Sequence, residues 1–235
     1  MNVAVIIARG GSKRIPKKNI RNFAGKPIIA YSIGVAMNSK MFERIIVSTD
    51  SLEVAEISRT YGAEIPFRRP AELANDHVGT DEVLIHALQW LHENDRSYDF
   101  ACCIYPTAPL LKAKYLKEGL KCLKQSKATT SISVAAYRSP IFRSLKVNER
   151  GRLIMNWEKY YDCRSQDLPE AYHDAGQFYW VDVKKYLQEK RVWSQDSVPV
   201  VIPFNYVMDI DTEDDWKAAE IMFKSIKGNK RHGKL

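Results

Sequence analysis

Residues 3–19 read VAVIIARGGSKRIPKKN, an apolar run that leads directly into a basic loop with two glycines. The run from Val3 to Ala8 is apolar on both faces, which is typical of a central strand in a parallel sheet. The loop carries five cations and no acid, and its glycines let backbone N–H groups approach a phosphate closely. A solvated basic turn is the alternative interpretation. Because open α/β sheets bind ligands where their strands end, we expect this loop to bind phosphate groups.

Strand and helix signals alternate along the rest of the chain, which predicts an α/β fold with a mixed, mostly parallel sheet. Further strands are expected at residues 44–49, 100–105, 129–135, 177–181, 200–204 and 207–211. Helices are expected after Pro27, at 52–61 and 113–125, and after Thr80 and Thr212 as N-caps. One core can grow to about this size, so residues 1–235 are expected to form a single domain.

Two segments depart from this alternation. Residues 137–175 contain a predicted hairpin and several aromatic side chains among charges, a composition more typical of an association surface than of a free loop. We therefore interpret them as an inserted lobe. The Gly- and Lys-rich end, 227–235, lacks apolar periodicity and is expected to be a disordered tail.

Composition restricts the class of protein. The chain has 235 residues, of which 45% are hydrophobic, and no apolar run approaches the ~20 residues of a membrane helix. With no signal peptide in the sequence, we expect a cytoplasmic protein without a membrane partner. The four cysteines lack Cys-x-x-Cys spacing, so neither a zinc site nor a disulfide framework is expected.

The formal charge of +8 suits anionic partners such as nucleotides, acidic sugars or nucleic acid. A basic nucleic-acid-binding module is therefore the alternative from another functional class. Such modules present a basic stripe with interleaved aromatic residues or a known reading helix, and the N-terminal loop has only Phe23 nearby. We accordingly expect no nucleic-acid partner.

Two carboxylates near the end of the chain are candidate metal ligands. Asp209 and Asp211 are two apart on an expected strand, which would turn both side chains to one face. Carboxylate oxygens suit Mg²⁺, which keeps several waters and bridges to substrate phosphates. Acids that favour the N-terminus of the following helix are the alternative interpretation.

Five segments, in order along nearly the whole chain, resemble the CMP-sialate synthetase family of cytidylyltransferases. They are residues 7–13 (IARGGSK) with Pro16, Lys18 and Asn19, then 46–50 (IVSTD), 69–73 (RPAEL), 106–110 (PTAPL) and 209–213 (DIDTE). The resemblance implies a Rossmann-like nucleotidyltransferase fold, CTP as substrate and Mg²⁺ on Asp209 and Asp211. It also implies a homodimer, because in that family the inserted lobe pairs two subunits.

The resemblance and the chemistry of the residues together assign the site. Arg9, Lys18 and Asp211 are the expected catalytic residues, since cations and a bound metal stabilise charge developing on a triphosphate. The expected nucleotide-binding residues are Ala8, Arg9, Gly10, Gly11, Ser12, Lys13, Lys18, Asn19, Arg69, Asp76 and Thr80. By composition alone, the loop at 69–80 and the turn at 106–109 could equally be surface structure.

The sugar side departs from the sialate pattern. Leu111 stands where sialate synthetases carry Arg, and residues 173–176 read HDAG where those enzymes have RPNG. Residues 173–179 (HDAGQFY) instead resemble the branch of the family that acts on pseudaminic acid, so an acidic nonulosonic sugar of that kind is the expected acceptor, with sialic and legionaminic acids as alternatives. The expected sugar-binding residues are Tyr105, Thr107, His173, Asp174 and Gln177.

Overall fold

The computed structural model describes residues 1–232, with side chains described for 1–228. A six-stranded sheet forms its centre, and its strands run in the order β10 (Ser197–Val201), β6 (Thr130–Ala136), β9 (Tyr172–Asp182), β5 (Phe100–Ile104), β1 (Asn2–Ile7) and β4 (Arg44–Ser48). β9 is antiparallel to both of its neighbours, and the other neighbouring pairs are parallel. The predicted mixed, mostly parallel sheet is confirmed.

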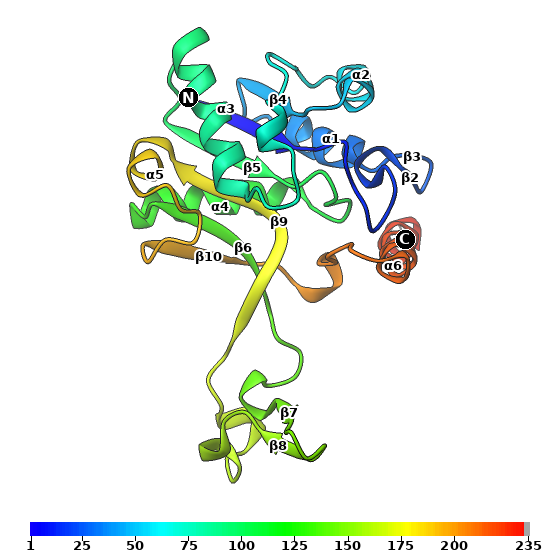
Figure 1. Cartoon of the computed structure of the whole chain (residues 1–235), viewed down its shortest axis with the longest axis vertical. Coiled ribbons are helices and arrows are strands. Elements are labelled where there is room, and N and C mark those ends of the chain that lie inside the picture. The colour runs from blue at the N-terminus through cyan, green and yellow to red at the C-terminus, as the bar shows by residue number, and fades with distance from the viewer. Residues whose placement is uncertain (233–235) are drawn as a thin grey trace.

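Helices cover both faces of the sheet because β1 is apolar on both (Figure 1). Ala4 and Ile6 pack with α1 (Ile29–Ser39), α2 (Leu52–Thr60) and α4 (Ala113–Ser126). Val3 and Val5 pack on the opposite face with α3 (Thr80–Asn94) and α5 (Val183–Glu189). The minor elements are β2 (Asn22–Phe23), β3 (Lys26–Pro27) and the 3-10 turns η1 (Lys18–Ile20), η2 (Ala71–Leu73), η3 (Ile141–Arg143), η4 (Glu158–Tyr160), η5 (Ser165–Asp167) and η6 (Phe204–Tyr206).

The helix starts test the predicted caps. Thr212 caps α6 (Glu213–His232) as expected, because its hydroxyl accepts the Asp215 N–H at 3.2 Å while the Asp215 carboxylate accepts the Thr212 N–H at 2.8 Å. The prediction for Thr80 is wrong: Gly79 is the N-cap of α3, and the Thr80 hydroxyl is hydrogen-bonded to Tyr105 instead. Pro27 does not open α1 either, since it belongs to the short strand β3.

The end of the chain also differs from expectation. Residues 207–211 form no strand, although their apolar pattern is strand-like. Ile210 is instead buried in a small cluster away from the sheet, which accounts for the apolar signal. Helix α6 continues to His232, into the stretch expected to be a disordered tail, and residues 233–235 of that stretch lie outside the described residues.

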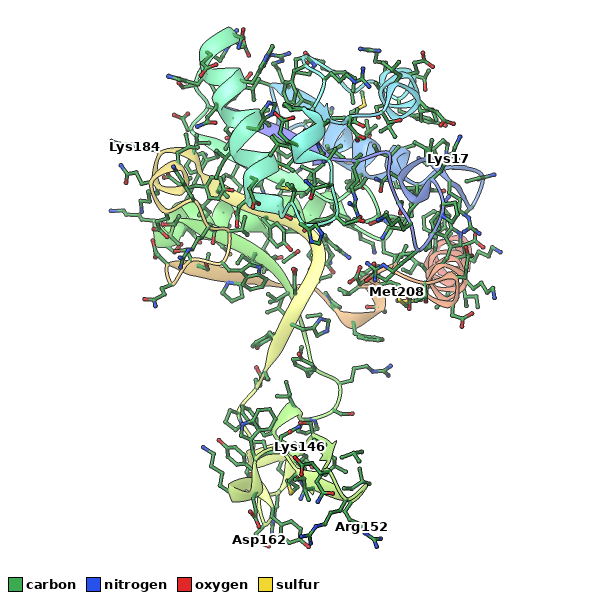
Figure 2. All side chains as sticks on the ribbon, in the orientation of Figure 1. Lys17, Lys146, Arg152, Asp162, Lys184 and Met208 are labelled. Atoms are coloured by element: carbon green, nitrogen blue, oxygen red, sulfur yellow. The ribbon has the colours of Figure 1, made fainter. Side chains whose placement is uncertain are left out.

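The inserted lobe lies away from the sheet, at the end of a stem made by the ends of β6 and β9 (Figure 1). It contains the antiparallel hairpin of β7 (Leu145–Val147) and β8 (Leu153–Met155). Figure 2 shows Lys146, Arg152 and Asp162 grouped on this lobe, far from the labelled residues of the body. Phe142 contacts the rings of Trp157 and Tyr160, and all three side chains remain at least partly exposed. Among the described residues, no helix is long and apolar enough to span a membrane.

Candidate active site

A cavity of about 540 Å³ lies where β1, β4 and β5 end. These three strands are parallel neighbours, so the loops that follow them leave the sheet at the same edge. Ten of the residues predicted from the sequence line this one cavity: Arg9, Ser12, Lys13, Lys18, Asn19, Arg69, Asp76, Thr80, Tyr105 and Thr107. The nucleotide-binding prediction and part of the sugar-binding prediction therefore meet in one place.

The loop after β1 is fixed by hydrogen bonds at both ends. Asp50, at the end of β4, accepts the Gly10 N–H at 2.9 Å, and Asn19 donates its amide to the Arg9 carbonyl at 2.8 Å. A side chain at Gly10 would place its Cβ 2.8 Å from the Cβ of Ser51, so glycine is required by space at this position. The loop is thus held close against the neighbouring strand, and four of its five cations line the cavity.

Two of these cations share one carboxylate. Arg9 lies 2.6 Å and Lys13 2.5 Å from the oxygens of Asp76, which comes from the loop before α3. Hydrogen bonds from Lys13 and then from Arg9 hold the pKa of Asp76 below its usual value. All three side chains reach solvent, so the cations are open to an anionic ligand that displaces the carboxylate.

Lys18 joins the basic loop to the segment at 209–211. Its Nζ donates to the Ile210 carbonyl at 2.6 Å and lies 3.4 Å from Asp211 Oδ1, while Arg14 lies 2.8 Å from the same oxygen. The cause is a shared apolar cluster: Ile15 of the loop and Ile210 are both fully buried in it, together with Trp216 of α6. Two loop cations, Arg14 and Lys18, therefore lie at the Asp211 carboxylate.

Asp209 and Asp211 suit a divalent cation by their chemistry. Desolvation and the nearby Asp211 carboxylate raise the pKa of Asp209, although the side chain reaches the surface. A cation between two carboxylates relieves such repulsion, and Mg²⁺ takes its other ligands from waters and phosphates. Among the described residues no group of three or more His, Cys, Asp or Glu is placed to hold a metal, so this pair would depend on the substrate for further ligands.

Arg69 forms part of the cavity floor. It is 5% exposed and donates to the Ser48 hydroxyl at 3.1 Å and to the Ser48 carbonyl. Burial lowers the pKa of Arg69 to about 10, which still leaves the guanidinium charged at neutral pH. It therefore offers fixed hydrogen-bond donors to whatever fills the cavity.

The expected sugar-binding residues on β9 lie where that strand leaves the sheet for the lobe. His173 pairs with Ala135 of β6, and its Nδ1 lies 2.8 Å from the Asp174 carbonyl, with its ring against Tyr137. Asp174 accepts the Gly176 N–H at 2.9 Å and the hydroxyl of Tyr179. Gln177 is 2% exposed, and its amide donates to the Tyr206 carbonyl. Both His173 and Asp174 are partly exposed, whereas Gln177 is enclosed by the protein.

Three predicted nucleotide-binding residues are outside the cavity lining. Ala8 is fully buried in the core, and its N–H donates to the Ser48 carbonyl. Gly10 and Gly11 shape the loop without facing the cavity. Conversely, Arg14, Asp50 and Tyr179 were not predicted from the sequence. Arg14 was visible as one of the five loop cations, whereas Asp50 reaches Gly10 only because β1 and β4 are paired. Tyr179 and Asp174 lie on the same strand, β9, where the Tyr179 hydroxyl donates to Asp174.

Comparisons with known proteins agree with this geometry. The chain is 42% identical, over 95% of its length and 96% of the relative, to pseudaminic acid cytidylyltransferase of Campylobacter jejuni (strain 81-176). It is 32% identical to CMP-N,N'-diacetyllegionaminic acid synthase of Legionella pneumophila, over 93% of this chain and 94% of the relative.

A solved structure of CMP:2-keto-3-deoxy-manno-octonic acid synthetase complexed with CTP superimposes with a TM-score of 0.69 at 16% identity, over 95% of this chain and 98% of that one. At such low identity this likeness bears on the fold alone, and it confirms the predicted nucleotidyltransferase fold. Residues 3–224 match the sequence profile of the family described as cytidylyltransferase. Taken with the cation-lined cavity at the ends of β1, β4 and β5, these matches establish that the chain belongs to the cytidylyltransferase family.

Proposed function

We propose that this cytidylyltransferase transfers CMP from CTP to pseudaminic acid and releases pyrophosphate. The observation that carries the proposal is the 42% identity, across 95% of the chain, to an enzyme named for that sugar. The legionaminic acid synthase is a more distant relative at 32% identity. The HDAG segment at 173–176 supports the same choice, because it departs from the sialate pattern on the sugar side of the site.

The loop cations would contact different parts of the triphosphate. Arg9 and Lys13, now paired with Asp76, are free to exchange that carboxylate for the outer phosphates. Lys18 is held by the Ile210 carbonyl and Asp211, so it is placed beside the carboxylates that would hold Mg²⁺. Mg²⁺ on Asp209 and Asp211 would neutralise charge on the reacting phosphates.

The chemical step is an in-line displacement. The anomeric hydroxyl oxygen of the sugar forms a bond to the α-phosphorus, the α–β phosphoanhydride bond breaks, pyrophosphate leaves and the hydroxyl proton passes to solvent. Arg9 and Lys18 stabilise the charge that develops on the phosphate oxygens. Tyr105 and Thr107, which follow β5, would orient the sugar together with His173 and Asp174 of β9.

The direct test compares sugar acids. The purified protein is given CTP, Mg²⁺ and pseudaminic, N-acetylneuraminic or N,N'-diacetyllegionaminic acid, and pyrophosphate release is measured. We expect the highest kcat/KM with pseudaminic acid. Higher kcat/KM with either of the other acids would replace the proposed substrate, and release with none of them would count against the function itself.

We also propose that the protein is a homodimer that pairs through the lobe. Apolar side chains gather there at the surface, with Val147 66% and Leu153 67% exposed. Leu153→Asp should give a monomer by light scattering in solution, because it places a charge in the apolar contact. Ile221→Asp is the matched control, since Ile221 is equally exposed at 68% but lies on α6, away from the lobe. A wild-type monomer at micromolar concentration would contradict the proposal.

We further propose that the enzyme works in the cytoplasm, where CTP is supplied. Its four cysteines, all within the described residues, are free, which suits a reducing compartment.

A further inference from the structure

Another cavity, of about 200 Å³, lies between α2 and the segment at 65–68, and we call it the α2 groove. Leu52 and Ala55 line it from the helix, and Pro66 and Phe67 line it from the segment. Its surface is therefore apolar along both sides. The volume is below the ~300–1,000 Å³ of typical ligand pockets, so the groove admits only a small molecule.

The two sides of the α2 groove are fixed by the fold. Ser51 caps α2 by accepting an N–H of the first turn at 3.3 Å. The N–H groups that flank the opposite segment, those of Glu64 and Arg69, donate at 2.8 Å to carbonyls of β4 and of the residue that follows it. The ring of Phe67 contacts an aromatic ring of α3, with centroids 5.3 Å apart. The groove is thus formed before any ligand enters it.

Two arginines bring positive charge to the α2 groove. Arg59 lines it from the last turn of α2, and Arg68 lines it from the segment at 65–68. Within residues 1–228 neither guanidinium forms an ion pair, and the neighbouring acids Glu53 and Glu64 are paired with other cations. A guanidinium binds a carboxylate through two parallel hydrogen bonds, so this pair suits an acid whose body is apolar.

The α2 groove lies directly behind the loop that follows β1. Thr49 and Ser51 line the groove, and Asp50 between them accepts the Gly10 N–H of that loop at 2.9 Å. Arg68 donates its Nε to the Asp50 carbonyl at 3.1 Å. Asp50 is therefore bonded both to an arginine of the groove and to the loop whose cations line the catalytic cavity.

The geometry points to the α2 groove as a regulatory site for a small aromatic carboxylic acid, whose binding weakens the binding of CTP. The carboxylate pairs with Arg59 and Arg68, and the aromatic ring packs between Leu52 and Phe67. This site lies outside the catalytic cavity and serves any sugar acceptor, so the inference goes beyond the proposed function.

The link between the two sites is the hydrogen bond from Arg68 to Asp50. A ligand shifts an equilibrium only through interactions that differ between two states. An acid in the groove competes with the Asp50 carbonyl for the Arg68 guanidinium, and Asp50 then holds Gly10 less firmly. The loop cations are less well placed for the triphosphate as a result. By linkage, CTP must weaken the binding of the acid by the same factor.

The test uses 3-phenylpropionate as the probe, and the neutral 3-phenylpropanamide as its matched control compound. We expect a Kd on the order of 1 mM for the acid by NMR titration, as is usual for so small a ligand. The amide should bind about tenfold more weakly, because it carries no charge for the arginines. At saturating acid, the Kd for CTP with Mg²⁺ should rise about fivefold by calorimetry, and saturating CTP should raise the Kd for the acid equally.

Arg59→Gln separates the α2 groove from the catalytic cavity, because Arg59 lines the first and not the second. We expect the Kd for the acid to rise about tenfold, and its effect on CTP to be lost at the concentration that saturates the wild type. The Kd for CTP alone should not change. Arg96→Gln is the control variant, since Arg96 is also an exposed arginine but lies outside the groove. Leu52→Asp, at a position that is 66% exposed, replaces Arg59→Gln if that variant does not fold.

The outcomes separate this inference from the proposed function. Absence of saturable binding at ten times the expected Kd overturns the inference, and so does binding that leaves the Kd for CTP unchanged. An acid that weakens CTP binding equally in wild type and Arg59→Gln also overturns it, because the acid then acts at the cations of the catalytic cavity. A wild type that shows both expected effects but turns over no sugar acid leaves the inference standing and removes the proposed function.

Discussion

The nucleotide half of the site and its sugar half are built differently. On the nucleotide side, the loop after β1 is tied to the end of β4 by the bond of Gly10 to Asp50, and Arg69 is bonded to Ser48 of β4. On the sugar side, His173 and Asp174 lie on β9 near a register shift, and Gly176 has a φ of +60°. In the proposed site, the phosphate-binding groups are thus fixed to the sheet, whereas the sugar-binding groups of β9 lie on a short irregular stretch of that strand.

The largest effect that would sharpen this comparison is expected at Asp211. Asp211→Ala removes a proposed Mg²⁺ ligand and also the partner of Arg14 and Lys18, so turnover should fall about 1,000-fold at saturating CTP and sugar. Asp214→Ala is the control, because Asp214 is 93% exposed at the start of α6 and pairs only with Lys217 among the described residues. Turnover of Asp211→Ala within threefold of the wild type would contradict a role of the 209–211 segment in the nucleotide half.

Lys18→Met should have the next largest effect. The side chain is 19% exposed and is fixed by Ile210 and Asp211, so its charge is preorganised for the reacting phosphates. We expect kcat to fall about 100-fold with little change in the KM for the sugar, measured by initial rates of pyrophosphate release. Lys17→Met, one residue earlier and paired with Glu53 at the surface, should behave as the wild type. Equal losses in both variants would mean that the net charge of the loop, and not the position of Lys18, supports catalysis.

Features with a local sequence pattern could be predicted, whereas features that depend on contacts between distant residues could not. The strand at 2–7 and its basic loop were readable, because an apolar run and a glycine-containing cation cluster are local signals. The conformation of residues 207–211 could not be predicted in this way, because Ile210 is buried in a cluster with distant residues and not against a neighbouring strand. Thr80 likewise has the residue type of a cap, but a tertiary partner, Tyr105, takes its hydroxyl. The ring contact between Tyr105 and Tyr179 depends on strand pairing between β5 and β9, which no local pattern encodes.

On the sugar half, His173→Ala should act on one substrate only. The ring lies on the stem, against Tyr137, and within the described part of the chain it makes no hydrogen bond with a nucleotide-side cation. We expect the KM for pseudaminic acid to rise about tenfold while the KM for CTP stays within twofold. His92→Ala is the control, since His92 is exposed near the end of α3 and bonds to Ser97. A matching rise in the KM for CTP would show that the two halves are not separable.

The smallest effect is expected at Asp76, the carboxylate that pairs with two cations of the nucleotide half. Asp76→Asn should tighten CTP binding about threefold by calorimetry, because the triphosphate no longer displaces a charged group from Arg9 and Lys13. Lys13 and Arg9 lower the pKa of Asp76, so its ion pairs persist above the usual carboxyl pKa and are lost only as pH falls through the lowered value. The difference between variant and wild type should therefore be constant from about pH 6 to 8. Glu53→Gln, which removes a surface carboxylate paired with Lys17, should leave CTP binding unchanged. Weaker binding in Asp76→Asn would mean that this carboxylate contacts the nucleotide directly, and the cations would then need no displacement to bind phosphate.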